Sequence, residues 1–478
     1  MPKYERVLAL VTLFLLQAFA VGSGVAVANL TPVDRSLPRP PAVAARTPLP
    51  PAAPPPAAAA DAPMPAADAL TGELAALASG SGAEISAVVI DARTRRTLFA
   101  HRADRPAVPA STTKLVTSVA ALSALGPHHR ITTRVVRGGP RAVVLVGGGD
   151  PTLTARTPSA GAYPRYASLA DLADQTAAAL KQTGTGEIRV DYDASLYEGA
   201  GTAEGWKPNY LPDGEVAPMS ALTVDAGRTG DGGRVKDPAA SAAKKFVRLL
   251  KDRGVRAELG ERTVADKAAA TVGQVHSPPL SVLVERTMTV SDNDVAEALL
   301  RQVALKRGAP VSFEGGARAV MAELARLGVA EGVRVHDGSG LSTRNRIPPL
   351  ALARIVSLAA SAEHPELRAA ITGMPVAGFT GTLAAPRYTT AQTAAGAGAV
   401  RAKTGTLSGV STLAGLVHDA DGRRCRDVGG VGGPRWAEHV REHHRAESDE
   451  ELRLAYVALT RAAGHLTAWW AGTTNTGR

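Results

Sequence analysis

Residues 110–122 read ASTTKLVTSVAAL, a stretch that combines a serine and a lysine with an apolar segment. The apolar residues from Leu115 to Leu122 have a spacing typical of a helix with one buried face. Ser111 and Lys114 stand at its start, three positions apart, so they share one face of a helical turn. A serine is a weak nucleophile until a base takes its proton, and a lysine becomes that base only if burial or a neighbouring cation lowers its pKa. The stretch therefore predicts a nucleophilic serine beside a lysine base.

Two further motifs supply polar side chains that suit the same chemistry. Ser291-Asp-Asn293 lies between two segments with helical periodicity, and Lys403-Thr-Gly405 lies within residues 400–417, which predict two strands around a glycine-rich turn. A loop presents a hydroxyl and an amide to one cleft, and an edge strand offers a cation, hydroxyls and backbone groups to a peptide carboxylate. Either these motifs converge on one site with Ser111, or they form a surface helix, a loop and a strand that share no site.

The three motifs, S-x-x-K, S-D-N and K-T-G in that order, resemble the D-alanyl-D-alanine carboxypeptidase/endopeptidase family of low-molecular-mass penicillin-binding proteins, of the DacB type. Each motif alone is too short to be specific. Ser111 and Ser291 lie 180 positions apart, which suits this family, in which inserted domains separate the first two motifs. The resemblance covers residues 69–421 and includes four longer segments: Gly147-Gly-Gly-Asp-Pro-Thr-Leu153, Pro218-Met-Ser-Ala-Leu-Thr-Val-Asp225, Val290-Ser-Asp-Asn-Asp-Val-Ala-Glu297 and Asp337-Gly-Ser-Gly-Leu-Ser342.

The resemblance implies a fold and a role for each motif residue. The expected fold is α+β, with a β-lactamase/transpeptidase-like antiparallel sheet flanked by helices, a large inserted β-rich region and an atypical C-terminal tail. Ser111 would form an acyl-enzyme with the penultimate D-Ala of a peptidoglycan stem peptide, and Lys114 would be the general base. The other implied assignments are Ser291 as proton relay, Asn293, Lys403, Thr404, Gly405 and Thr406 as substrate-binding residues, and the backbone N–H groups of Ser111 and Thr406 as the oxyanion hole.

The same resemblance predicts the ligands, which are peptidoglycan peptides as substrates and β-lactams as inhibitors. No cofactor and no metal are expected, because His439, His443 and His444 have a suitable helical spacing but no acidic third ligand in register. The chain has no Glu-x-x-Leu-Asn segment of the kind that class A β-lactamases use for fast deacylation, so a bound penicillin should stay bound. The alternative function is a non-catalytic protein that binds penicillin or peptidoglycan and whose catalytic sheet is disrupted because the central strand is missing.

Composition divides the chain into a leader, a linker and a folded body. Residues 1–30 place Lys3 and Arg6 before an uncharged apolar run, which is typical of a signal peptide that is either cleaved or retained as a membrane anchor. Residues 31–67 are rich in Pro and Ala and suit a semi-extended tether. We therefore expect an extracytoplasmic protein. Its predicted body consists of a first transpeptidase-like part at 68–134, inserted domains at 135–274, a second transpeptidase-like part at 275–422 and a tail at 423–478.

Hydrophobic periodicity predicts the main elements of this body. A short helix is expected at 70–77 and a hairpin from 85–91 and 98–100. The inserted region is expected to mix short strands with one helix at 166–180. Helices should dominate 280–327 and 350–360.

Charge and cysteine content add two constraints. The formal net charge of +10 favours a polyanionic neighbour such as wall polymer, anionic lipid or nucleic acid, although basic residues scattered over a solvated surface give the same value. The single cysteine, Cys425, excludes an intramolecular disulfide. Hydrophobic residues make up 45% of the 478, enough for a sizeable core.

The tail departs from the family pattern. The family places an apolar strand in the middle of the sheet after residue 422, but residues 423–434 are charged and glycine-rich, which does not suit a strand buried on both faces. Residues 450–462 instead resemble the last motif of UvrD/RecB-type helicases, with Arg461 in the phosphate-contacting position. The chain has no G-x-x-x-x-G-K-[S/T] loop, so neither nucleotide nor nucleic acid is an expected partner. The tail is either a joined fragment or an unrelated amphipathic helix at 449–463, and Leu466 to Trp470 could fill the vacant strand position.

Overall fold

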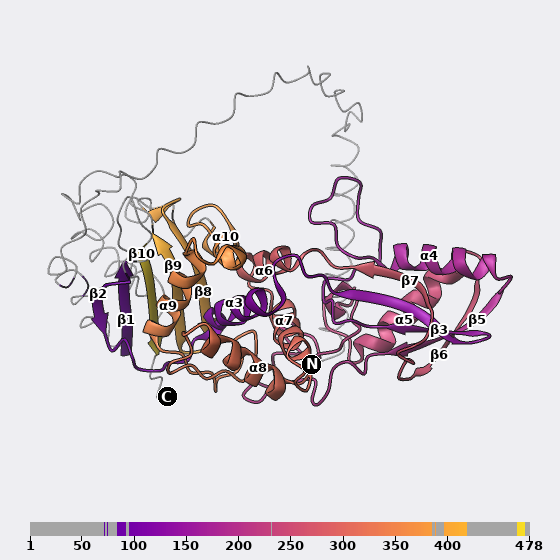
Figure 1. The fold of residues 1–478 in the computed structure, drawn as a ribbon, viewed down its shortest axis with the longest axis horizontal. Coiled ribbons are helices and arrows are strands. Elements are labelled where there is room, and N and C mark those ends of the chain that lie inside the picture. Colours follow the sequence, from indigo (N-terminus) through magenta and orange to yellow (C-terminus); the bar gives the residue numbers. More distant parts are fainter. Residues whose placement is uncertain are drawn as a thin grey trace, which may run out of the picture. The chain divides into compact units, whose positions relative to one another are not determined.

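The computed structural model describes residues 71, 74, 84–91, 95–230, 232–384, 388, 396–417 and 466–473. The first feature of the fold is a five-stranded antiparallel sheet in the order β2-β1-β10-β9-β8. Figure 1 labels these strands, which are β1 (Glu84–Asp91), β2 (Thr97–His101), β8 (Val400–Leu407), β9 (Val410–Val417) and β10 (Leu466–Thr473). The predicted hairpin at the start and the predicted strand pair at 400–417 are both confirmed.

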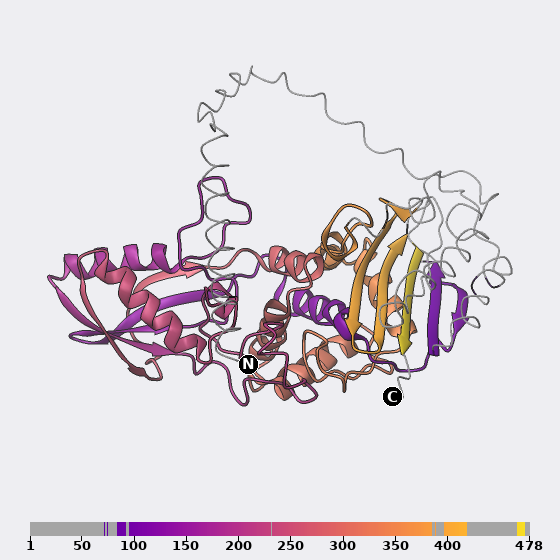
Figure 2. The same ribbon diagram turned by 180° about the vertical axis from the view of Figure 1, so that it is seen from behind.

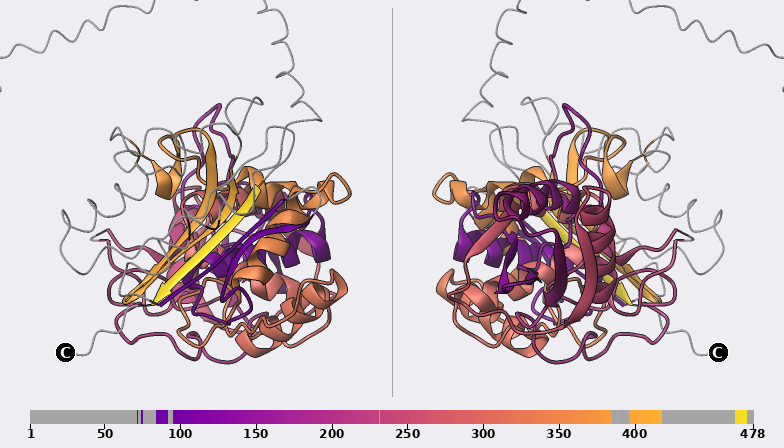
Figure 3. Two further views of the ribbon diagram at one scale, coloured as in Figure 1. Left: turned by 90° about the vertical axis from the view of Figure 1, so that its left-hand side faces the viewer. Right: turned by 90° about the vertical axis from the view of Figure 1, so that its right-hand side faces the viewer.

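The central position of this sheet is occupied by β10. This strand pairs in antiparallel register with β1, where Ala468 lies opposite Val89, and with β9, where Ala468 lies opposite Gly415. Figure 3 shows it in yellow between the orange and indigo strands. The position that residues 423–434 could not fill is therefore taken by a strand that includes Leu466 to Trp470, as one hypothesis from the sequence suggested.

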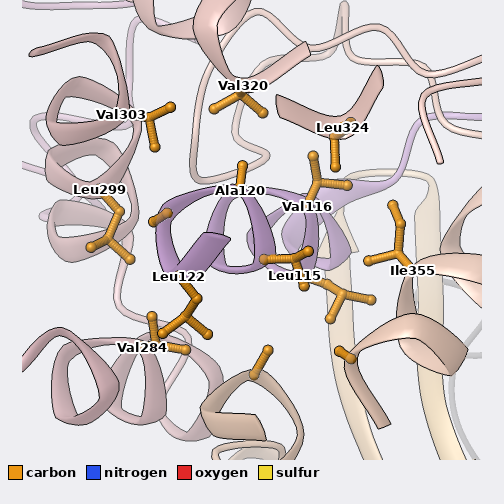
Figure 4. Packing of buried hydrophobic residues seen from close by; sticks show 14 of the residues in the cluster. Leu115, Val116, Ala120, Leu122, Val284, Leu299, Val303, Val320, Leu324 and Ile355 are labelled. Carbon is orange, nitrogen blue, oxygen red and sulfur yellow. The ribbon is translucent and has the colours of Figure 1, made fainter. Parts of the chain in front are cut away.

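Helices pack around one apolar core next to this sheet, and α3 (Thr113–Leu125) lies at its centre. Its side chains Leu115, Val116 and Leu122 are fully buried. Figure 4 shows them surrounded by residues of neighbouring helices, and Figure 2 shows the same arrangement of helices and sheet from behind. The neighbouring helices are α6 (Leu280–Thr289), α7 (Asn293–Lys306), α8 (Phe313–Arg326), α9 (Pro349–Ala360) and α10 (Arg368–Thr372). The helices predicted at 280–327 and 350–360 are confirmed.

The inserted region has its own sheet and its own apolar core. The second five-stranded sheet has the order β6-β5-β4-β3-β7, with parallel pairing between β4, β5 and β6. Two helices cover it where one was predicted: α4 (Leu169–Gln182) was expected, and α5 (Pro238–Lys251) was missed. The strands are β3 (Thr132–Gly139), β4 (Ala142–Val146), β5 (Glu187–Asp193), β6 (Arg256–Arg262) and β7 (Thr271–His276), so the sheet extends slightly beyond the predicted limits of 135 and 274.

Several predictions concern residues outside the described part of the chain. These are the leader at 1–30, the linker at 31–67, the histidines from His439 to His444 and the helicase-like segment with Arg461. Of the helix predicted at 70–77, Thr71 and Leu74 are described, and both are helical. Among the residues that the structure describes, none belongs to a helix with the length and hydropathy needed to cross a membrane.

Candidate active site

Ser111 lies in a single 3-10 turn, Ala110–Thr112, that leads directly into α3. Ala110 has a left-handed backbone (φ +46°), which turns the chain sharply before the helix begins. A second segment packs tightly against this turn, because a Cβ added to Gly340 would lie 1.9 Å from the carbonyl oxygen of Ala110. The Ser111 hydroxyl is therefore held on a tightly packed turn at the N-terminal end of a buried helix.

Lys114 reaches back from the first turn of α3 and makes three contacts. Its Nζ lies 2.9 Å from the Ser111 Oγ, 2.7 Å from the Asn293 Oδ1 and 2.7 Å from the carbonyl oxygen of Ser339. The side chain is fully buried. The predicted pairing of Ser111 with Lys114 is thus present, and the Asp337-Gly-Ser-Gly segment forms the floor beneath it.

Burial lowers the pKa of Lys114 to about 8, because the charged amine loses its hydration. The carboxylates of Asp337 and Glu297 oppose this effect by favouring the ammonium form. Of the two causes that the sequence suggests, burial and a neighbouring cation, burial is the dominant one. A pKa near 8 leaves part of the population with a neutral amine under mildly alkaline conditions, which is the state in which a lysine accepts a proton.

The S-D-N motif forms a tight turn at the start of α7. Ser291 has a left-handed backbone (φ +59°), and the Asp292 side chain caps the helix by accepting a hydrogen bond from the Val295 N–H. Asn293 is the first residue of α7, where its Oδ1 accepts from Lys114 and its Nδ2 donates to the carbonyl oxygen of Glu215 at 2.8 Å. The loop predicted between two helices is therefore a single turn.

The K-T-G motif lies on β8, which is the edge strand of the sheet as predicted. Lys403 is fully buried and donates to the Ser291 Oγ at 2.9 Å and to the carbonyl oxygen of Thr404 at 2.7 Å. Burial first, and then the nearby charge of Lys114, hold the pKa of Lys403 well below its ordinary value. The S-D-N turn thus joins two hydrogen-bonded groups, Ser111–Lys114–Asn293 and Ser291–Lys403.

The remaining two motif residues and Thr406 differ in their surroundings. Gly405 passes so close to the Ser111 turn that an added Cβ would lie 2.8 Å from the Ser111 nitrogen. The Thr404 hydroxyl is 2.7 Å from the Thr382 hydroxyl, a contact that the sequence did not predict. Thr406 is exposed. Of these three residues, Gly405 thus packs against the Ser111 turn, Thr404 contacts Thr382, and Thr406 is exposed to solvent.

The backbone of β8 shows which groups face away from the sheet. The Val400 carbonyl and the Ala402 N–H bond to residues 377 and 375 and not to β9. Successive residues of a strand direct their backbone N–H and C=O groups to alternate sides. The backbone groups of Thr404 and Thr406 therefore also point away from β9. The Ser111 turn lies beside this outer side of β8, where the Thr404 carbonyl oxygen accepts from the Lys403 Nζ, and an extended peptide that pairs with β8 would lie against Ser111.

Several polar groups of the site were not predicted. Glu297, one turn after Asn293, accepts from the N–H groups of Gly338 and Ser339, and burial raises its pKa. The sequence does contain a sign of Glu297, because this acidic residue lies among the apolar positions of the α7 segment. Glu215 contributes a backbone carbonyl, which any residue has, so no side-chain pattern could have indicated it.

The model of the D-Ala-D-Ala carboxypeptidase 3 (S13) family matches residues 70–231 and 229–426. The chain belongs to this family. Both the family resemblance and the expected enzyme class, a D-Ala-D-Ala carboxypeptidase, are therefore confirmed at the level of the family.

Individual relatives agree with this assignment. Carboxypeptidase DacB from Mycolicibacterium smegmatis is 38% identical over 372 residues, which are 76% of this chain and 79% of that protein. A D-alanyl-D-alanine carboxypeptidase from Actinomadura sp. strain R39 is 30% identical over 415 residues, covering 71% of this chain and 76% of the relative. The crystal structure of penicillin binding protein 4 (dacB) from Haemophilus influenzae has a TM-score of 0.63 at 20% identity and covers 87% of this chain and 94% of that one, which confirms the fold.

A second similarity is short. The RecBCD enzyme subunit RecB from Mycobacterium tuberculosis is 48% identical over 59 residues, which are 12% of this chain and 5% of that subunit. The helicase resemblance is therefore confined to a small segment.

Proposed function

We propose that this protein is a serine-type D-Ala-D-Ala carboxypeptidase/endopeptidase that acts on peptidoglycan stem peptides through an acyl-enzyme at Ser111. One observation carries the proposal: the buried amine of Lys114, with its pKa lowered to about 8, lies 2.9 Å from the Ser111 hydroxyl. A base of this pKa next to a hydroxyl is the arrangement that activates a serine at near-neutral pH.

Acylation begins when the neutral amine of Lys114 accepts the proton of the Ser111 hydroxyl. The Ser111 Oγ then bonds to the carbonyl carbon of the penultimate D-Ala, and the bond from that carbon to the nitrogen of the terminal D-Ala breaks. Ser291, which accepts a hydrogen bond from Lys403, relays the proton taken up by Lys114: its hydroxyl proton goes to the leaving nitrogen, and the Lys114 ammonium replaces that proton. The net result is transfer of one proton from Ser111 to the amine of the departing D-Ala.

The substrate is held by β8 and by the turn at Ser111. The N–H groups of Ser111 and Thr406 bind the oxygen that becomes negative in the tetrahedral intermediate. Lys403, together with the hydroxyls of Thr404 and Thr406, receives the terminal carboxylate. The arriving carboxylate favours the ammonium form of Lys403 and so opposes the effect of burial on its pKa.

Water then cleaves the ester, releasing the shortened peptide and restoring the Ser111 hydroxyl. A β-lactam that acylates Ser111 would remain attached for longer, because the sequence lacks the Glu-x-x-Leu-Asn segment of fast-deacylating β-lactamases. β-Lactams are therefore expected to be inhibitors. The non-catalytic alternative depended on a vacant central strand, and β10 occupies that position in the described sheet.

The proposed substrate implies where the enzyme acts. Peptidoglycan lies outside the cytoplasmic membrane, so we place the folded body there, with residues 1–30 as signal peptide or anchor and residues 31–67 as tether. The body then comprises the transpeptidase-like parts 68–134 and 275–422, the inserted domains 135–274 and the tail 423–478.

The test is the release of D-alanine from two substrates, a soluble pentapeptide that ends in D-Ala-D-Ala and a cross-linked peptide dimer. Wild type should release D-alanine from the pentapeptide, and Ser111→Ala should release none. Cleavage of the dimer measures the endopeptidase activity in the same experiment. Equal release by both proteins would overturn the assignment of Ser111, and no release by wild type would favour the non-catalytic alternative.

A further inference from the structure

The inserted region contacts the site through a buried ion pair. Arg234 belongs to the inserted region, and its Nη2 lies 3.0 Å from the Oδ2 of Asp294, the residue after Asn293. The Arg234 and Asp294 side chains are 4% and 9% exposed. A charged pair removed from water is costly unless its geometry is well satisfied, so such a pair is weak evidence for a purely stabilising role.

The pair fixes one short segment on both sides of Glu215. Arg234 donates from Nε and Nη2 to the carbonyl oxygen of Gly214, at 3.2 and 3.0 Å, and from Nη1 to that of Ala226. Asp294 accepts from the Ala217 N–H at 2.8 Å. The chain is therefore anchored one residue before Glu215 and two residues after it.

The segment in turn determines the orientation of the Asn293 amide. The carbonyl oxygen of Glu215 only accepts hydrogen bonds, so the Nδ2 of Asn293 must face it and the Oδ1 must face the other way, toward Lys114. A flipped amide would point an N–H donor at the Lys114 Nζ, which also donates. The Glu215 carbonyl thus selects the amide orientation that holds the lysine beside Ser111.

We propose that Arg234 and Asp294 are positioning residues that act through Asn293: they hold the Gly214–Ala217 segment in the place that keeps the amide oxygen on Lys114. This inference rests on the proposed function, since it concerns the acylation of Ser111. It assigns a role in the reaction to the inserted region, which lies between the first and second motifs.

The test is a double-mutant cycle on the rate of Ser111 acylation by a labelled penicillin. Arg234→Gln removes the fork that binds Gly214 and Asp294, and it should slow acylation about tenfold or more, because small misplacements of catalytic groups have effects of that size or larger. In an Asn293→Ala background the same substitution should change the rate by less than about twofold, since the residue through which it acts is absent. Single-turnover reactions followed over hours make the slow variants measurable.

A matched control separates positioning from general stability. Arg262→Gln breaks another arginine–aspartate pair of the inserted region, Arg262 with Asp237, whose side chains are 53% and 49% exposed. Its acylation rate should equal that of wild type. If Arg234→Gln does not fold, Arg234→Lys keeps the charge but loses the fork and should show the same dependence on Asn293.

The outcomes are distinct. Equal slowing by Arg234→Gln with and without Asn293, or no slowing in either, would overturn this inference while leaving the proposed function intact. No penicillin adduct on the wild type would instead overturn the proposed function.

Discussion

In the proposed mechanism Lys114 makes the serine reactive, because its three contacts match the needs of a neutral amine. Such an amine has two N–H donors and one lone pair. With the N–H groups directed at the Asn293 Oδ1 and the Ser339 carbonyl, the lone pair remains for the Ser111 hydroxyl. The ammonium form donates to all three partners and holds the serine without activating it. The protonation state of one residue therefore separates the resting form from the reactive form.

The acylation rate should rise with pH as Lys114 loses its proton, with the acidic limb of the profile near its pKa of about 8. The exposed Glu215 carboxylate raises this pKa by favouring the ammonium form. Glu215→Gln keeps the backbone carbonyl but removes the charge, so it should shift the acidic limb to lower pH. Stopped-flow acylation by a chromogenic β-lactam between pH 5 and 10 measures the profile.

The control for this prediction is Glu198→Gln, which removes another exposed glutamate that is not among the groups with the largest effects on the Lys114 pKa, and the acidic limb should stay in place. If the acidic limb of the acylation profile moves to higher pH in Glu215→Gln, or does not move, the Glu215 charge does not raise the pKa of Lys114.

The motif residues were predictable from the sequence because each contributes a side chain that few other positions could replace. Ser111, Lys114, Ser291, Asn293 and Lys403 were all expected in one site, and the structure brings them together. Groups that act through the backbone, such as the Glu215 and Ser339 carbonyls, leave no such signal. They depend on how distant segments pack, which periodicity does not encode.

At the level of elements, the site depends on the close approach of β8 to the turn before α3. The approach is possible because residue 405 has no side chain. A Cβ there would lie 2.2 Å from the Thr412 Oγ1 and 2.8 Å from the Ser111 nitrogen. The glycine of the K-T-G motif is therefore explained by packing as well as by substrate binding.

Gly405→Ala should push β8 away from Ser111 and misplace the oxyanion-binding N–H groups. We expect acylation to fall at least about tenfold, and the free energy of unfolding to decrease by about 1–3 kcal/mol, as for other overpacked positions. Penicillin acylation and urea unfolding measure the two effects. Gly230→Ala is the control, because an added Cβ there meets no atom within 4 Å. Wild-type acylation by Gly405→Ala would show that the approach of β8 is not required.

Helices were predicted correctly from the sequence where apolar residues recur with helical periodicity. One helix was missed where charged residues interrupt that periodicity. The segment of α3 is apolar over most of its length and was recognised. The α5 segment has an apolar stripe that includes Ala239, Ala242, Phe246 and Leu250, but three basic residues lie among them, and the helix was missed. Its start has clear signals, since Asp237 caps the helix and Pro238 occupies the first turn.

For the whole molecule, the decisive feature is the origin of the central strand. The family pattern led to the expectation of an apolar strand directly after residue 422, and the sequence there is unsuitable. The structure uses Leu466–Thr473 instead and so restores the ladder between β1 and β9. Sequence reasoning could name this segment as a candidate, but only the paired register of three strands distant in sequence could place it.

The sheet makes a prediction about hydrogen exchange. A strand paired on both sides should have its amide hydrogens protected, because its N–H groups bond to neighbouring strands and not to water. The amides of Leu466–Thr473 should therefore exchange as slowly as those of β1 and β9. Mass spectrometry of peptic fragments measures this. Exchange at the rate of a free peptide in this segment, with β1 and β9 protected, would contradict the placement of β10.

The assignment of Ser111 as the nucleophile is tested by the mass of the protein after incubation with a penicillin. Wild type should gain the mass of one β-lactam molecule, and fragmentation should locate it on Ser111. Ser111→Ala should gain nothing while keeping its thermal unfolding temperature. An adduct on a different residue, or an equal adduct on Ser111→Ala, would contradict the account.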